Sequence, residues 1–167
     1  MTRKSPAKVR CERINQVAIA VKDLELVVEN FWNILGIGPW SLYDWEAPLV
    51  YDRTYYGKPA WARERIAIAR VGDVELELME VIDGPSIYRD WIEEHGEGLH
   101  HMNFLVDDFG AAMEALTHEG FECIQSARFG LPEKGCEYAY FDIPPLRTIW
   151  EPVYGNEPGV EPRMLFL

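Results

Sequence analysis

Four polar side chains in short apolar stretches of the sequence could together bind a metal ion. They are an amide, two carboxylates and an imidazole: Gln16, Glu77, His101 and Glu151. Amide and carboxylate oxygens with an imidazole nitrogen suit a divalent ion of intermediate hardness in five- or six-coordinate geometry, with positions left for water or a substrate. Two carboxylates buried together without a cation would be costly. We therefore interpret these residues as a candidate metal site, provided that the fold brings them together.

Each of these residues taken alone has a simpler interpretation. Glu77 lies in an alternating stretch that is equally typical of a half-solvated strand, and Gln16 alone is typical of a solvated or capping amide. His101 follows His100, and one histidine of such a pair often packs or hydrogen-bonds in a core. Glu151 lies between a tryptophan and a proline, where a surface position is less natural. The metal hypothesis therefore depends on the joint placement of the four residues.

An internal repeat predicts that joint placement. Residues 16–23 and 101–108 are short apolar stretches that each end on aspartate, and they lie 85 positions apart. Both aspartates, Asp23 and Asp108, can cap a helix whose apolar residues recur at i, i+3, i+4 and i+7. Each helix is followed by a glycine, which is typical of a helix end. The two segments therefore indicate two copies of one strand-helix unit.

Three further strand-like stretches follow each helix. They are residues 40–45, 65–70 and 74–81 in the first half, and 122–127, 138–142 and 148–153 in the second. Each half thus has the pattern strand, helix and three strands, which predicts one module at 13–82 and another at 98–154. A helix capped by Ser86 is expected within the connecting residues 83–97.

One helix leaves a face of a four-stranded sheet uncovered, so pairing of the two modules would enclose that face. Because side chains alternate along a strand, Gln16 shares a face with two alanines that leave room for a cavity. His101 has the same place in the second module, while Glu77 and Glu151 fall on the corresponding face of the two closing strands. A pseudo-twofold axis would then present all four side chains to one point. Residues 1–12 and 155–167 are expected to be terminal extensions.

Several stretches carry a resemblance to a known family. These are Gln-Val-Ala-Ile-Ala-Val-Lys-Asp-Leu and Gly-Leu-His-His-Met-Asn-Phe-Leu-Val-Asp-Asp, with Val-Glu-Leu-Glu-Leu-Met-Glu and Ile-Trp-Glu-Pro-Val. Over residues 14–153 the chain resembles the vicinal oxygen chelate superfamily, which includes glyoxalase I, methylmalonyl-CoA epimerase, extradiol dioxygenases and bleomycin-resistance proteins. The resemblance implies an α+β fold in which two βαβββ modules pair into a cupped, barrel-like mixed sheet around a metal ion.

The resemblance also implies which residues bind the ion. The four ligand positions of the family fall at Gln16, Glu77, His101 and Glu151, and the ion would be divalent Zn, Ni, Co, Mn or Fe. This ligand set is similar to that of some glyoxalase I enzymes, whereas the stretch 98–104 is more like the epimerases. A glutamine in the first position argues against the two-histidine iron site of the dioxygenases. Four filled positions argue against a protein that only sequesters its ligand.

We therefore expect a metal-dependent isomerase, epimerase or lyase that transfers a proton through a metal-stabilised enolate of a small oxygen-chelating substrate, with a CoA thioester as one candidate. By resemblance, Glu151 is the first choice for the base and Glu77 is its counterpart. Glu64 and His100 are weaker candidates that are more often structural. A lactoylglutathione lyase of the glyoxalase I type and a non-catalytic, antibiotic-type binding protein are the alternatives.

The substrate class depends on two weaker signals. Five cations in one stretch, interleaved with aromatic residues, are Arg53, Lys58, Arg63, Arg65 and Arg70. In a loop they could attract the phosphates of CoA or the carboxylates of a glutathione adduct, or be balanced by local acidic residues. Further aromatic residues that could line a pocket, a core or a subunit interface are Trp32, Trp40, Tyr43 and Trp45.

The composition excludes several classes of function. With 16 Lys+Arg and 28 Asp+Glu, the formal net charge of −12 repels phosphate backbones and anionic lipids, so we expect neither a nucleic acid nor a membrane as partner. No apolar stretch approaches the roughly 18 residues of a membrane span. The 3 cysteines lack CxxC spacing, which is typical of reduced thiols in the cytoplasm. We expect a cytoplasmic homodimer that acts on a small molecule.

Overall fold

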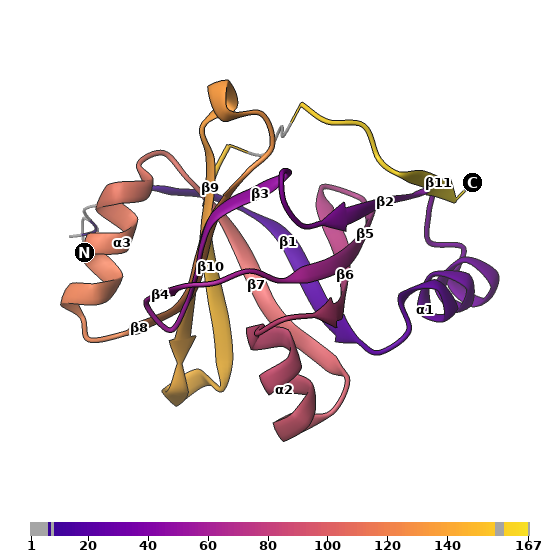
Figure 1. Cartoon of the computed structure of the whole chain (residues 1–167), viewed down its shortest axis with the longest axis horizontal. Coiled ribbons are helices and arrows are strands. Elements are labelled where there is room, and N and C mark those ends of the chain that lie inside the picture. The colour runs from indigo at the N-terminus through magenta and orange to yellow at the C-terminus, as the bar shows by residue number, and fades with distance from the viewer. Residues whose placement is uncertain (1–6, 8, 156–158, 167) are drawn as a thin grey trace, which may run out of the picture.

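The computed structural model describes residues 7, 9–155 and 159–166. Its strands form one 11-stranded mixed sheet in the order β11-β2-β5-β6-β1-β7-β10-β9-β8-β3-β4 (Figure 1). The strands are β1 (Cys11–Val21), β2 (Trp40–Trp45), β3 (Val50–Tyr55), β4 (Lys58–Pro59), β5 (Arg63–Val71), β6 (Val74–Asp83), β7 (Gly98–Val106), β8 (Glu122–Phe129), β9 (Cys136–Ile143), β10 (Thr148–Tyr154) and β11 (Met164–Phe166). The α-helices are α1 (Leu24–Asn30), α2 (Ile87–His95) and α3 (Phe109–His118).

The centre of the sheet is symmetric. β1 and β7 lie antiparallel to each other, and each has a parallel partner on its other side, β6 and β10 respectively. In the first pair Ala18 lies opposite Glu77, and in the second Asn103 lies opposite Glu151. Because Ala18 and Asn103 are 85 positions apart, the register of the sheet follows the repeat in the sequence. Glu77 and Glu151 therefore occupy equivalent positions about a pseudo-twofold axis.

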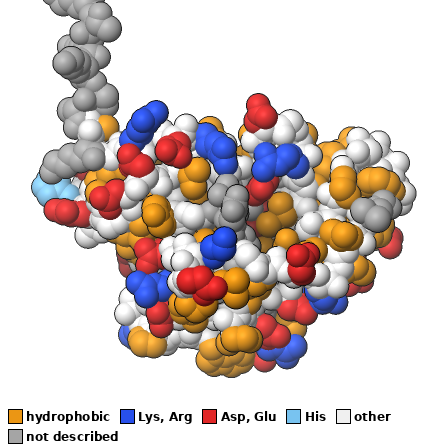
Figure 2. All heavy atoms as spheres, turned by 90° about the horizontal axis from the view of Figure 1, so that it is seen from above, with side chains coloured by type: hydrophobic (Ala, Val, Ile, Leu, Met, Phe, Trp, Pro, Cys, Tyr) orange, Lys and Arg blue, Asp and Glu red, His pale blue; other side chains and the backbone are white. Residues whose placement is uncertain are grey.

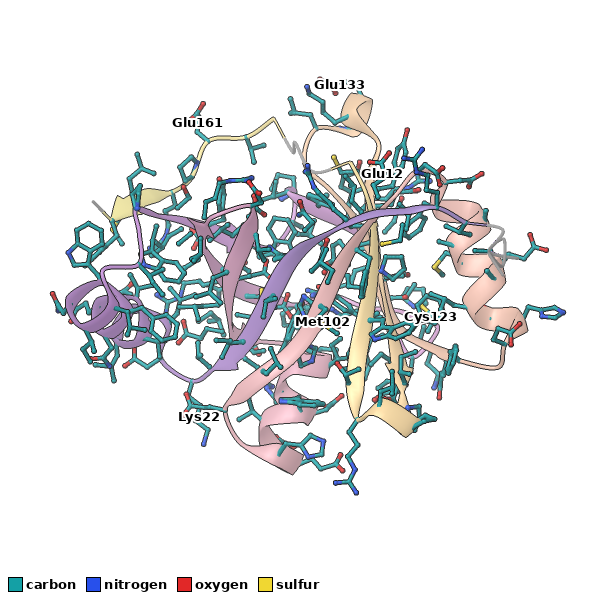
Figure 3. The ribbon with its side chains drawn as sticks, turned by 180° about the vertical axis from the view of Figure 1, so that it is seen from behind. Glu12, Lys22, Met102, Cys123, Glu133 and Glu161 are labelled. Atoms are coloured by element: carbon teal, nitrogen blue, oxygen red, sulfur yellow. The ribbon has the colours of Figure 1, made fainter. Side chains whose placement is uncertain are left out.

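The two faces of the sheet have different packing. α1 and α3 cover the two ends of the outer face, each over its own cluster of buried apolar residues (Figure 3). The inner face holds a third cluster, to which strands from both halves contribute. The rings of Trp45 on β2 and Phe129 on β8 lie 5.2 Å apart, although six strands separate β2 from β8 in the sheet order. The sheet is therefore curled into a cup, but its edge strands β11 and β4 do not close it into a barrel.

Side-chain caps fix where the helices begin. The carboxylate of Asp23 accepts a hydrogen bond from the backbone N–H of Leu26, and that of Asp108 accepts one from Ala111. α1 continues as a π-helical turn at Phe31–Leu35, which ends at a glycine in the left-handed conformation. The hydroxyl group of Ser86 accepts from the N–H of Tyr88 at the start of α2. The predicted helix starts and the predicted connecting helix are thus present.

Three strands toward the edges of the sheet, β3, β4 and β11, were not expected from the sequence. The segment with the clustered cations is not a loop at Arg53, because this residue lies in β3, which pairs with β8 of the other half. The alternation of β3 is hidden by a register shift between Tyr51 and Thr54, with Asp52 at a positive φ of 51°. At the other edge β11 pairs with β2. The added strands at both edges of the sheet pair with backbone groups that would otherwise be left unpaired.

Parts of the predicted terminal extensions, residues 1–6, 8, 156–158 and 167, lie outside the described residues. The exact division into modules at 82/83 and 97/98 stays a prediction. Among the helices of the described segments, none has both the length and the apolar character that a bilayer crossing requires. On the face shown in Figure 2, acidic and basic side chains are interspersed, and hydrophobic side chains lie between them.

The two caps provide a test of the repeat. We expect Asp23→Ala and Asp108→Ala each to lower the free energy of unfolding by about 1 kcal/mol, because each leaves the first turn of a helix without its acceptor. The helices lie at opposite ends of the sheet, so the double variant should lose roughly 2 kcal/mol by simple addition. Urea unfolding followed by circular dichroism measures all three values. A cap variant as stable as the wild type would show that this helix start does not depend on the aspartate.

Candidate functional site

The four candidate residues lie together on the inner face of the sheet. Gln16 is on β1, Glu77 on β6, His101 on β7 and Glu151 on β10, so each of the four central strands contributes one side chain. Their exposed fractions are between 0% and 7%. The structure therefore places all four in the interior, at the position where the two halves of the sheet meet.

Short distances connect the four side chains. The Nε2 atom of Gln16 donates a hydrogen bond to Oε1 of Glu77 at 3.1 Å. The Nε2 atom of His101 lies 3.1 Å from Oε2 of Glu151 and 3.6 Å from Oε2 of Glu77. One imidazole nitrogen is thus flanked by two carboxylates that come from equivalent positions in the two halves. The role of these residues as ligands stays a prediction.

Two asparagines extend the site beyond the residues that the sequence indicated. Asn103 shares a face of β7 with His101, and its Nδ2 donates to Oε2 of Glu151 at 2.6 Å. Its carbonyl oxygen is buried and has no hydrogen-bond partner in the described part of the chain. Asn15 lines the same cavity as its neighbour Gln16, because the pairing of β1 with β7 shifts register between Ile14 and Gln16. Strict alternation would have placed Asn15 on the outer face.

His100 lies directly behind His101. The Nδ1 atoms of the two rings are 2.8 Å apart, and both side chains are almost fully buried. Burial and the adjacent His101 lower the pKa of His100 well below its ordinary value, so this ring is neutral. One of the two Nδ1 atoms must donate to the other. If His101 is the donor, its Nε2 keeps a lone pair that points at the two carboxylates, which is the form in which histidine binds a metal ion.

A cavity of about 350 Å³ opens onto this cluster. Aromatic and aliphatic side chains make most of its wall, among them Trp45, Tyr138 and Tyr140. At an exposed part of the wall, Nη2 of Arg70 lies 3.1 Å from Oε1 of Glu75. The site thus combines a mostly apolar pocket with a few convergent polar groups, which is typical of small-molecule sites.

The two carboxylates repel each other. Burial, followed by the negative charge of Glu151, raises the pKa of Glu77 well above its ordinary value. In the absence of a cation the pair therefore retains a proton on Glu77 at a pH where an exposed glutamate is ionised. A positive charge between the carboxylates would remove the repulsion and release that proton.

The chemistry of the donor set suits a divalent ion. The Nε2 atom of His101 is buried without a hydrogen-bond partner among the described residues, and it faces two carboxylates. Atoms that bind one ion at about 2.1 Å lie roughly 3 Å apart when the angle between them is near 90°, which is close to the 3.1 Å between His101 and Glu151. Within residues 9–155, however, no group of three or more His, Cys, Asp or Glu side chains is spaced as a formed metal site.

The weaker catalytic candidate Glu64 has a structural environment. It is fully buried, and its Oε2 accepts from Nη2 of Arg53 at 2.5 Å while its Oε1 accepts from the hydroxyl group of Ser86 at 2.6 Å. Other cations of the same stretch also have acidic partners: Arg63 with Glu46, Arg65 with Glu25 and Glu80, and Arg70 with Glu75. In the structure these arginines are therefore paired with nearby acidic side chains and do not form a free cationic loop.

The aromatic residues separate into two groups. Trp40 is fully buried beneath α1, and Trp32 contacts Phe166 of β11 edge-on. Tyr43 and Trp45 point to the other face of the same strand β2 and line the cavity. The sequence left pocket, core and interface open for these residues, and the structure assigns two of them to the pocket.

Comparison with known protein families identifies the group to which this fold and site belong. The family model described as Glyoxalase/Bleomycin resistance protein/Dioxygenase superfamily matches residues 15–140. The chain belongs to this superfamily. The resemblance that the sequence motifs carry is thereby confirmed, as is the cupped mixed sheet with few helices.

Solved structures of low sequence identity share the fold of this superfamily member. A hypothetical protein from Bacillus halodurans is 19% identical, with a TM-score of 0.63, over 87% of this chain and 95% of that chain. A variant of methylmalonyl-CoA epimerase from Streptomyces coelicolor, in complex with 2-nitronate-propionyl-CoA, is 20% identical, with a TM-score of 0.62, over 87% and 96%. Methylmalonyl-CoA epimerase from Mycobacterium tuberculosis is 18% identical, with a TM-score of 0.61, over 91% and 93%.

A curated relative gives no further functional information. The uncharacterized protein YqjC of Bacillus subtilis is 24% identical over 112 residues, which are 67% of this chain and 70% of that protein. The family model therefore establishes the superfamily, and the solved structures show the fold. The chemistry has to be argued from the residues of this chain.

The raised pKa of Glu77 predicts how stability depends on pH in metal-free protein. Above the ordinary pKa of a glutamate, the folded protein holds a proton that the unfolded chain releases, so stability falls as pH rises toward the raised pKa. We expect Glu77→Gln to remove this loss and to be more stable than wild type at pH 8 but not at pH 4. Urea unfolding in the presence of a chelator measures both. Parallel pH dependence of the two proteins would contradict the assignment.

Proposed function

We propose that this protein is a metal-dependent enzyme that removes a proton from, and returns it to, a carbon atom next to the oxygen-bearing groups of a small substrate. The observation that carries the proposal is the meeting of Gln16, Glu77, His101 and Glu151 at one buried point beside a cavity. Two buried carboxylates around one imidazole nitrogen are unfavourable without a cation, and the cavity gives a substrate access to them.

The four residues would hold the ion, with Asn103 orienting Glu151 through its amide hydrogen bond. Gln16 presents its amide nitrogen to Glu77, and rotation of the amide presents its oxygen to a cation instead. A divalent ion supplies electrophilic stabilisation of negative charge on substrate oxygens, which makes an adjacent C–H bond more acidic. All other contributions to the proposed proton transfer come from side chains of this protein.

Glu151 is the proposed base, and Glu77 its counterpart in the other half. In proton abstraction the C–H bond breaks, the proton forms an O–H bond on a carboxylate, and the electron pair moves toward the neighbouring carbonyl oxygen. Because the two carboxylates approach from opposite halves of the sheet, one can take a proton from one side of the substrate and the other can supply a proton from the opposite side. This arrangement supports inversion at that carbon.

The substrate class follows from the cavity and from the neighbours. The methylmalonyl-CoA epimerase structures hold 2-nitronate-propionyl-CoA or methylmalonyl-CoA. The cavity of about 350 Å³ is large enough for a short branched acyl group with its thioester, whereas the bulk of a CoA moiety has to extend outside it. We propose a 2-methyl-branched acyl-CoA as the first substrate to test.

The decisive experiment measures exchange of the substrate α-proton. With one equivalent of Co²⁺ or Zn²⁺, we expect the protein to incorporate deuterium from D₂O into methylmalonyl-CoA, followed by mass spectrometry. Glu151→Gln should lower the exchange rate by roughly 10²–10⁴-fold, because the base is lost. Glu75→Gln is the matched control, since Glu75 lies on the same face of β6 two residues from Glu77 but at the exposed part of the cavity wall.

Three results would overturn the proposal. Full exchange activity in Glu151→Gln would remove this residue from the mechanism. Turnover of the hemithioacetal of methylglyoxal and glutathione, without exchange of methylmalonyl-CoA, would favour a lactoylglutathione lyase. A wild-type protein that binds no divalent ion would favour a non-catalytic binding protein.

The contact between the two histidines predicts a selective effect on metal affinity. In the tautomer in which His101 donates, His100→Leu removes the acceptor that holds the proton on Nδ1 of His101, and we expect it to weaken Co²⁺ binding roughly 10–100-fold. His100→Gln keeps an acceptor oxygen and should retain most of the affinity. Isothermal titration calorimetry compares the three proteins. An equal loss in both variants would mean that packing, rather than the hydrogen bond, is what His100 contributes.

A further inference from the structure

Tyr138 is a buried cavity residue whose oxygen interacts with the indole N–H of Trp45, but whose O–H group has no acceptor in the described part of the chain. The side chain is 2% exposed and lines the cavity beside the candidate metal site. Buried polar groups without partners are rare in proteins, and each one calls for a physical explanation. A group outside the chain that accepts a hydrogen bond would supply that explanation.

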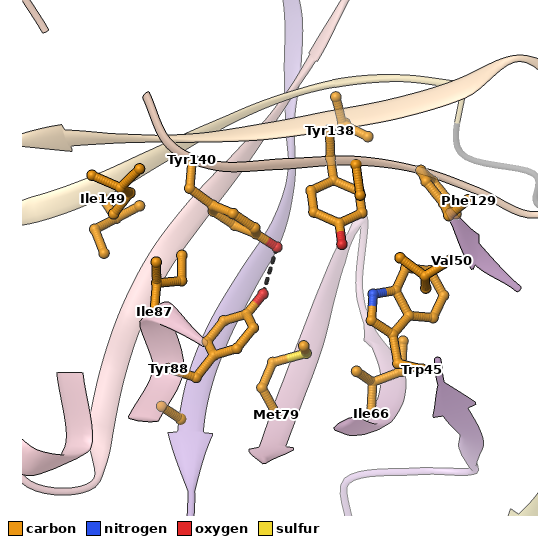
Figure 4. Packing of buried hydrophobic residues seen from close by; sticks show 14 of the residues in the cluster. Trp45, Val50, Ile66, Met79, Ile87, Tyr88, Phe129, Tyr138, Tyr140 and Ile149 are labelled. Carbon is orange, nitrogen blue, oxygen red and sulfur yellow. Dashed lines mark hydrogen bonds between the residues drawn. The ribbon is translucent and has the colours of Figure 1, made fainter. Parts of the chain in front are cut away.

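The neighbouring tyrosine shows the contrast. Tyr140 is two residues away on the same face of β9, and its hydroxyl oxygen accepts a hydrogen bond from the hydroxyl group of Tyr88 at 2.5 Å (Figure 4). The O–H group of Tyr88 therefore has an acceptor within the protein, whereas that of Tyr138 has none among the described residues.

Donors lie around the hydroxyl group of Tyr138, and the carboxylates of Glu64 and Glu151 act on it through their charge without a hydrogen bond among the described residues. Arg53 is close enough for its positive charge to act on the phenol oxygen, and Figure 4 shows the indole nitrogen of Trp45 pointing toward the same hydroxyl group. Arg53 is held by Glu64, and its Nε and Nη1 atoms have no partner among the described residues. Burial raises the pKa of Tyr138, so the phenol keeps its proton at neutral pH. The group that is left unused is therefore an O–H donor.

The register of the sheet places this donor relative to the candidate metal site. Tyr138 lies opposite Val153 in the pairing of β9 with β10, and Glu151 is two residues before Val153 on the same face. One step of two residues along a strand is roughly 7 Å. A small molecule that reaches Glu151 with one oxygen can therefore meet Tyr138 with a second oxygen-bearing group further along the cavity.

We infer that the hydroxyl group of Tyr138 donates a hydrogen bond to a carbonyl or carboxylate oxygen of the bound small molecule, and that Arg53 and Trp45 keep that hydroxyl group free to do so. This assigns the cavity a second recognition point, distinct from the four candidate ligands. It selects ligands that carry an oxygen acceptor beyond the groups that meet the metal site. This inference deepens the proposed function. It depends on the proposed function only for the location of the ligand in this cavity.

The test uses two neutral probes of the same shape, acetophenone and ethylbenzene, which differ in one carbonyl group. The affinity of metal-free protein for each is measured by ligand-observed NMR titration. In Tyr138→Phe we expect the ratio of the two affinities, acetophenone over ethylbenzene, to fall roughly 10-fold relative to wild type, because one hydrogen bond is lost. Tyr55→Phe is the control, because the hydroxyl group of Tyr55 donates to Asp90 away from the cavity, and the ratio should not change.

A second readout separates recognition from structure. Because the hydroxyl group that Tyr138→Phe removes donates no hydrogen bond within the described part of the chain, the ligand-free variant should be about as stable as wild type in urea unfolding, whereas Tyr55→Phe should be slightly less stable. An unchanged affinity ratio, a destabilised Tyr138→Phe variant, or failure of wild-type protein to bind acetophenone at millimolar concentration would overturn the inference. Neither probe needs a metal ion or the exchange reaction, so failure of the proposed function would not be confused with failure of this one.

Discussion

The burial of two carboxylates around one imidazole is the constraint on which the rest of the structure depends. Glu77 and Glu151 come from strands that are separated in the sequence by nearly half the chain, and both flank Nε2 of His101. Their mutual repulsion opposes folding unless a proton or a cation lies between them. The hydrogen bonds from Gln16 and Asn103 hold the carboxylates in place despite that repulsion. The apolar walls of the cup exclude the water that would otherwise weaken every one of these interactions.

Much of the fold was predictable because the sequence contains two copies of the same strand-helix unit. The offset of 85 residues, the two aspartate caps and the alternation of β1 and β7 predicted the paired sheet and the face on which Gln16 and His101 lie. The edge strands were not predictable in the same way. β3 contains a register shift and a residue with positive φ, so its alternation is broken, and β11 is only three residues long. Their pairing depends on contacts between distant segments, which a local pattern does not contain.

The candidate site also shows that local sequence patterns do not contain contacts between distant segments. Residues that occupy equivalent places in the repeat were found from sequence, whereas those whose position depends on a bulge or on tertiary packing were missed. Asn15 reaches the cavity only because of a shift in register, and the interest of Tyr138 is that the described residues offer its O–H group no acceptor. The sequence predicts Arg53 in a cationic loop. Its buried partner Glu64 is recognisable only in the fold, because Arg53 lies in β3 and Glu64 in β5. Amino acid type and spacing thus indicate donors, but not whether another residue already satisfies them.

The positions of the four central strands along the chain also determine when the candidate site can form during synthesis. Its four side chains are contributed by strands that begin near residue 11 and end at residue 154, so a chain emerging from the ribosome lacks the last of them until residue 151 has been added. The contacts that assemble the centre are long-range in sequence and are of the kind that form slowly. A chain synthesised only as far as β9 therefore has an incomplete set of candidate ligands, because Glu151 follows on β10.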